Sequence, residues 1–129
     1  QRARRFTMVG GRMAPYDSWP ILKTHTADRV FPTGLGGVLY PPGSLRQDAR
    51  RDADFMRLCP KGDDLWLYWA ASEGVTHRLI DPPGPLTVWG LSQFSALYKD
   101  NRKGGNDRQL AALFSVYGLP RPVKEAMPL

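Results

Sequence analysis

The sequence has 129 residues, a net charge of +6 and a single cysteine, Cys59. This length fits one domain, residues 1–129, and one cysteine excludes both an internal disulfide and a four-cysteine zinc site. The longest stretch without a charge, residues 30–45, contains three prolines, which excludes a membrane-spanning helix there. His25 and His77 lie far apart without ligand spacing, so we expect no metal site built from this chain alone.

The first half of the chain predicts short strands and one short helix. Residues 5–9, RFTMV, predict a strand that ends at the glycine pair 10–11. Residues 37–40, GVLY, predict a second strand, which the double proline that follows must end or leave on an edge. Residues 52–58 predict a short helix that Pro60 closes.

The centre of the chain predicts the most buried helix, residues 63–73. Its body, LWLYWAAS, is apolar on nearly every face. Asp63 is placed to cap its N-terminus, and Asp64 lies in the first turn. Residues 75–80 then predict a strand, and residues 91–98 a further helix.

Residues 106–117 predict the last helix. Asn106 and Gln109 have the spacing of a capping box, and Gly118 follows as a stop signal. The apolar positions of this helix fall on one face: Leu110, Leu113, Phe114 and Tyr117. The alternation of strands and helices predicts an α/β fold, with a small mixed sheet of three or four strands flanked by helices.

Two stretches carry residues suited to chemistry. Gly34, Gly36 and Gly37 have no side chains, so the backbone there can approach a ligand, although glycines also serve a bulged turn before a strand. Their spacing matches neither a dinucleotide-binding loop nor a phosphate-binding loop. Asp64 is expected to stay ionised through the helix dipole, either as a general base for a hydroxyl group or merely as a charge that complements the dipole.

Four motifs together resemble the carboxyl-terminal half of GT-A-type glycosyltransferases, which have the fold of nucleotide-diphospho-sugar transferases. They are similar in particular to bacterial family-2-like enzymes, and the resemblance covers roughly residues 2–117. The motifs are APYDSWP (Ala14–Pro20), FPTGLGGVLYPP (Phe31–Pro42), LCPKGDDLW (Leu58–Trp66) and NDRQ (Asn106–Gln109).

The resemblance implies that a parent protein transfers a sugar from a nucleotide-sugar donor to a hydroxyl of a glycan or lipid-linked acceptor, in bacterial surface polysaccharide synthesis. Asp64 would deprotonate the acceptor, with Asp63 as the alternative base. The three glycines 34, 36 and 37 would border the sugar, with Asp64 facing them across a cavity sized for a monosaccharide. Trp66 would either form an acceptor wall or pack into the core.

The same resemblance implies that the nucleotide-binding, amino-terminal half is missing from this sequence. That half holds Mn²⁺ or Mg²⁺ through a DxD motif at a strand end. Asp52-Ala53-Asp54 spells DxD but opens a predicted helix, so we expect no metal there, and no activity from the chain alone. The implied location is the cytoplasm, with peripheral attachment to the inner membrane as an alternative. Oligomerisation of the isolated half is a further option.

Two other functions remain open from the sequence. A non-enzymatic sugar- or protein-binding module would use the four tryptophans and five tyrosines for stacking. A nucleic-acid-binding domain would use the net charge of +6, but the basic residues form short clusters among acids and no nucleic-acid-binding motif is present.

Overall fold

The chain is a small α/β protein. Its structure, a computed structural model, describes residues 3–23, 29–34, 37–71, 75, 77–79 and 104–120. Within these residues it contains two two-stranded antiparallel sheets and three α-helices, so the coarse α/β prediction is confirmed. The elements are β1 (Ala3–Arg5), β2 (Met8–Val9), β3 (Arg12–Met13), β4 (Val30–Pro32), α1 (Asp52–Leu58), α2 (Asp63–Trp69) and α4 (Asn106–Tyr117).

The sheets differ from the single mixed sheet that the sequence predicted. β1 pairs with β4, and β2 and β3 form a hairpin, both antiparallel. Gly10 and Gly11 link the hairpin strands with φ of 56° and 76°, the left-handed conformation that a tight two-residue turn requires. The predicted strand over residues 5–9 was therefore wrong, because the chain leaves one sheet after Arg5 and enters the other at Met8.

Two further predicted strands are not found among the residues that the structure describes. Residues 37–40 lie outside both sheets, and the strand of this region is β4, several residues earlier. Gly37 has φ of 92°, which interrupts an extended chain, and Pro41 and Pro42 have no N–H groups to donate. Val75 and residues 77–79 also lie outside the sheets.

The helices agree better with the sequence, except at their ends. α1 has the predicted bounds, and α2 begins at Asp63 as predicted. The N-cap of α2 is Gly62, without a side-chain cap, so the assignment of Asp63 as the cap was wrong. α2 ends at Trp69, earlier than predicted, because Ala71 already pairs with Leu45 in an isolated bridge.

α4 has the predicted bounds, but its buried face is rotated from the predicted one. Its N-cap is Gly105 and no side chain caps it, so the capping box was wrong. Gln109, Leu110 and Leu113 are buried, whereas Phe114 is 41% exposed. This face packs on α1 and α2. The apolar stripe of an amphipathic helix is wide, so the sequence pattern alone does not show which apolar residue at its edge stays exposed to solvent.

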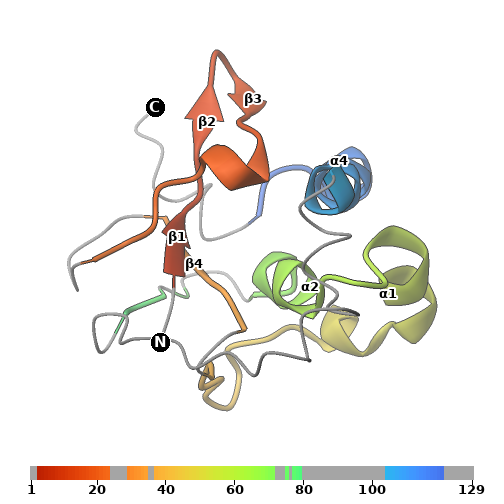
Figure 1. Cartoon of the computed structure of the whole chain (residues 1–129). Helices are drawn as coiled ribbons and strands as arrows, with labels where there is room; N and C mark the ends of the chain where they lie inside the picture. The colour runs from red at the N-terminus through yellow and green to blue at the C-terminus, as the bar shows by residue number, and fades with distance from the viewer. Residues whose placement is uncertain are drawn as a thin grey trace, which may run out of the picture.

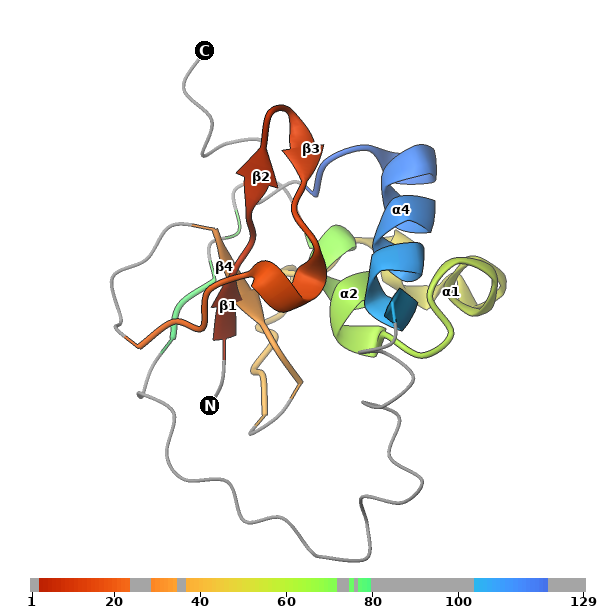
Figure 2. The same cartoon turned by 45° about the horizontal axis from the view of Figure 1, so that its top comes forward.

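α2 lies between the β1–β4 sheet and the helices α1 and α4 (Figure 1). Aromatic side chains pack around it. Phe6 lies 4.8 Å from Trp19 and 6.0 Å from Tyr68, measured between ring centroids. Phe31 of β4 packs edge-on against Tyr68 at 5.0 Å. These contacts fix α2 against β4, the strand that leads into the segment from Gly34 to Gly37, which we call the glycine segment. The β2–β3 hairpin lies beside α4 (Figure 2).

Two remaining expectations concern a membrane-spanning helix and the helix predicted over residues 91–98. No described helix is long and apolar enough to cross a membrane. The helix predicted over residues 91–98 lies outside the described part of the chain.

Candidate functional site

Two side chains of α4 hydrogen-bond to two other motifs, one that follows β3 and one that precedes α2. Asp107 accepts a hydrogen bond from the backbone N–H of Tyr16 at 2.8 Å. Gln109 accepts one from the backbone N–H of Lys61 at 3.0 Å and donates to the carbonyl oxygen of Gly105 at 3.2 Å. The NDRQ segment therefore ties the APYDSWP and LCPKGDDLW segments together, a role that the sequence alone did not reveal.

A side chain at Gly62, in the turn before α2, would crowd its neighbours. A Cβ atom on Gly62 would lie 2.9 Å from Cδ1 of Leu65 and 3.3 Å from Oε1 of Gln109. The first distance is shorter than carbon atoms tolerate without a shift, and the two contacts come from different helices. A residue with a side chain at position 62 would therefore require Leu65 or Gln109 to shift.

The start of α2 lies near the glycine segment. The carboxyl group of Asp64 accepts a hydrogen bond from the backbone N–H of Leu65 at 2.9 Å. The backbone N–H of Gly34 lies close enough to lower the pKa of the same carboxyl group. Asp63, the alternative base, is exposed. Of the three predicted glycines, the structure places Gly34 against Asp64, whereas Gly36 lies outside the described residues.

Burial changes the chemistry of Asp64 from the predicted one. Removal from water raises the pKa of its carboxyl group, and the neighbouring charge of Asp63 adds to the rise. The N–H groups of Leu65 and Gly34 oppose this rise without cancelling it. The helix dipole was expected to keep Asp64 firmly ionised, but desolvation dominates, and a carboxylate with a raised pKa is the stronger base.

Two neutral groups lie in the field of the acidic pair. Burial, with the charges of Asp64 and Asp63, raises the pKa of Tyr40 to about 12. The same causes raise the pKa of Cys59 to about 12, so its buried thiol is unreactive at neutral pH. Tyr40 keeps its phenolic proton and remains a hydrogen-bond donor near Asp64. Sequence reasoning missed it, although it lies within FPTGLGGVLYPP.

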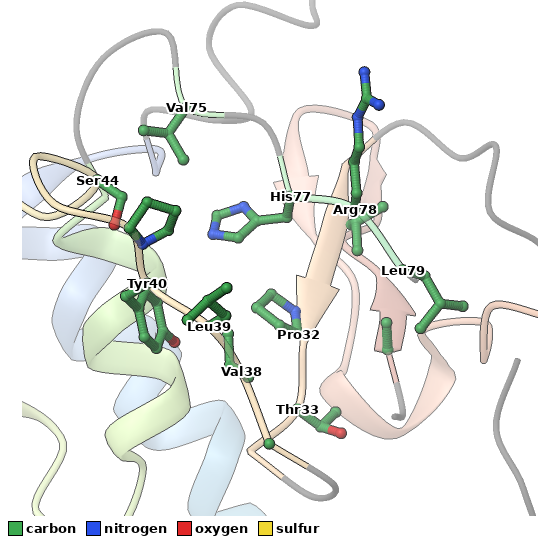
Figure 3. A pocket seen from close by; sticks show the side chains of 14 residues that line it. Pro32, Thr33, Val38, Leu39, Tyr40, Ser44, Val75, His77, Arg78 and Leu79 are labelled. Atoms are coloured by element: carbon green, nitrogen blue, oxygen red, sulfur yellow. The ribbon is translucent and has the colours of Figure 1, made fainter. Parts of the chain in front are cut away.

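A cavity of about 330 Å³ lies beside the glycine segment, but not where the sequence placed it. Gly37 and Tyr40 line it, whereas Asp64 does not. In Figure 3, Tyr40 and Ser44 stand on one side of the cavity and His77 on the other. Asp64 was expected to face the glycines across a cavity, but this cavity is lined by Gly37 without Asp64. His77, interpreted from the sequence as structural, faces this cavity.

Trp66 packs into the core. It is 5% exposed, and its Nε1 donates to the carbonyl oxygen of Ala49 at 3.0 Å. Its ring lies about 6 Å from those of Phe55 and Tyr117. Of the two roles predicted for Trp66, these contacts favour packing over an acceptor wall.

The DxD sequence does not fit a metal ion. Asp52 and Asp54 lie in the first turn of α1, and Asp54 accepts hydrogen bonds from Arg57 at 2.8 Å and from Tyr117 at 3.2 Å. These bonds lower the pKa of Asp54 and occupy both of its oxygens. Among the described residues, no three His, Cys, Asp or Glu side chains are grouped so that they could hold a metal.

Comparisons with known proteins return no match from family models, curated proteins or solved structures. The interpretation of the site therefore depends on its geometry and on the motifs themselves.

Proposed function

We propose that the chain is the acceptor side of a GT-A-type glycosyltransferase in which Asp64 is the catalytic base. The observation that supports this proposal is the proximity of the backbone N–H of Gly34 to the carboxyl group of Asp64, whose pKa it lowers, because it relates the glycine segment to the acidic helix start. They belong to two of the four motifs on which the resemblance to glycosyltransferases depends.

The proposed reaction is an in-line displacement at the anomeric carbon of the donor sugar. The acceptor oxygen forms a bond to that carbon, the bond from the carbon to the nucleoside diphosphate breaks, and the hydroxyl proton passes to Asp64. A carboxylate has about four lone-pair sites, so the hydrogen bond from Leu65 and the nearby N–H of Gly34 leave capacity for the acceptor hydroxyl. The raised pKa of Asp64 favours proton uptake, since a general base works best when its pKa approaches the operating pH.

Under this proposal the donor nucleotide and a divalent metal, Mn²⁺ or Mg²⁺, are bound by a polypeptide segment other than these residues. The bonding of Asp54 to Arg57 and Tyr117 supports that division, because the DxD of this chain is already used structurally. The proposal places the reaction in the cytoplasm or at the inner membrane surface, and it names a glycan or lipid-linked hydroxyl as the acceptor.

A transfer assay with the complete protein that carries this chain tests the proposal. Release of nucleoside diphosphate is measured with a panel of nucleotide sugars and Mn²⁺ or Mg²⁺. We expect Asp64→Asn to lower turnover by about 10²–10⁴-fold while donor binding is kept, because general-base catalysis contributes this much.

Asp63→Asn is the matched control, since it removes an adjacent but exposed carboxylate. We expect it to change turnover by less than about threefold, because an exposed charge acts only weakly on Asp64. Full turnover by Asp64→Asn, or loss of turnover in Asp63→Asn alone, would remove Asp64 from the proposed role.

A further inference from the structure

The cavity beside the glycine segment has the size and walls of a small-molecule site. Its volume of about 330 Å³ falls within the range typical of ligand pockets, roughly 300–1,000 Å³. Its walls are mainly apolar and come from parts of the chain far apart in sequence: Val30, Pro32, Val38, Pro41, Val75 and Leu79. An apolar hollow of this kind favours a ligand that is itself largely apolar.

Two buried polar atoms at this cavity have no partner within the described residues. They are Nδ1 of His77 and Oγ of Ser44, and both residues line the cavity. Native proteins pair nearly all buried polar atoms, because a buried atom without a hydrogen bond costs free energy. The imidazole of His77 reaches across the cavity toward the segment that carries Tyr40 and Ser44 (Figure 3). Rotation about its Cβ–Cγ bond can present either ring nitrogen to a ligand.

The charges around the cavity favour an uncharged ligand. Burial lowers the pKa of His77, so its imidazole is neutral at pH 7 and offers one donor and one acceptor. Arg78 is exposed, and its guanidinium group points away from the cavity (Figure 3). The remaining lining residues have no charge at neutral pH, because Tyr40 keeps its proton.

We propose that this cavity binds a small, uncharged, largely apolar molecule through one hydroxyl group that hydrogen-bonds to His77. Asp64 and Gly34 do not line the cavity, so the proposal stands apart from sugar transfer. The ring of His77 also contacts that of Tyr68, at a centroid distance of 5.2 Å. The cavity therefore presents a hydrogen-bonding group inside an apolar wall.

Benzyl alcohol and toluene form a matched pair of probes, because they differ by one hydroxyl group. Each is titrated into the ¹⁵N-labelled 129-residue chain, and the amide shifts are followed by NMR. We expect saturable shifts at residues that line the cavity, with benzyl alcohol binding about fivefold more tightly than toluene, as one net hydrogen bond implies. Three results with the unmodified chain would each overturn the proposal: no saturable shifts, shifts confined to another surface, or equal affinities for the two probes.

Two variants test the site itself. His77→Phe keeps a ring beside Tyr68 but removes both nitrogens, and we expect it to abolish the preference for benzyl alcohol. Val38→Trp fills the cavity from a half-buried position and should abolish binding of both probes. Val9→Trp makes the same change on exposed β2 and should leave binding unchanged. A folded His77→Phe that keeps the hydroxyl preference, or a folded Val38→Trp that still binds, would contradict the proposal.

Discussion

The hydrogen bonds of Gln109 give the sharpest prediction for stability. Gln109 lies in α4, is 8% exposed, and joins two backbone groups: it accepts from Lys61 at 3.0 Å and donates to Gly105 at 3.2 Å. Gln109→Met preserves the length of the side chain and removes both bonds. Each bond contributes about 1 kcal/mol net, so the variant should lose roughly 2 kcal/mol of unfolding free energy.

Urea denaturation and thermal melting measure this loss directly. For a chain of this size, 2 kcal/mol corresponds to a decrease in Tm of roughly 6–10 °C. Arg108→Met is the matched control, because it places the same side chain at the exposed neighbouring position of α4. We expect that control to change the unfolding free energy by less than about 0.5 kcal/mol. Equal stabilities of the two variants would refute the inference that Gln109 holds the start of α2.

Two further predictions concern the start of α2. Gly62→Ala should destabilise the chain by about 1–3 kcal/mol in urea denaturation, because its Cβ would meet Leu65 at 2.9 Å, whereas Gly34→Ala enters open space and should cost less. Asp64→Asn should flatten the pH dependence of stability measured between pH 3 and 8. The folded-state pKa of Asp64 lies above its ordinary value of 3.8, so the folded chain holds this proton more tightly and loses stability as the pH rises through the folded pKa. The asparagine variant should lack this loss of stability between pH 3 and 8. If stability depends on pH equally in the variant and in the unmodified chain, burial of the Asp64 charge is contradicted.

The helices were the most predictable part of the fold. α1, α2 and α4 begin where the sequence predicted, because a charged or polar residue precedes a run of apolar positions at each start. Their caps were not predictable, since tertiary contacts replaced the local ones. Gln109, for example, bonds to Lys61 instead of completing a capping box with Asn106.

The strands were predicted poorly because they are only two or three residues long. Alternation over so few positions contains little information about pairing. Gly10-Gly11 was a readable signal for the β2–β3 hairpin, yet it was interpreted as a strand end. The pairing of β1 with β4 joins segments separated by more than twenty residues, which no local pattern specifies.

The candidate site was partly predictable. The sequence predicted that Asp64 faces the glycines across a cavity; in the structure the N–H of Gly34 is close enough to affect the pKa of Asp64, but Asp64 does not line the cavity that contains Gly37. The raised pKa of Asp64 was missed because it arises from burial by residues distant in sequence. Tyr40 and His77 were missed for the same reason, since the cavity that they share is assembled only after folding.

The pKa of Asp64, measured by NMR titration of its carboxyl carbon in the 129-residue chain, tests most directly whether a half-buried base lies beside the glycine segment. We expect a midpoint above that of a model-peptide aspartate, with the amide signal of Gly34 moving at the same midpoint. A midpoint at or below the ordinary value of 3.8, or a Gly34 amide that does not respond, would contradict the proposed site.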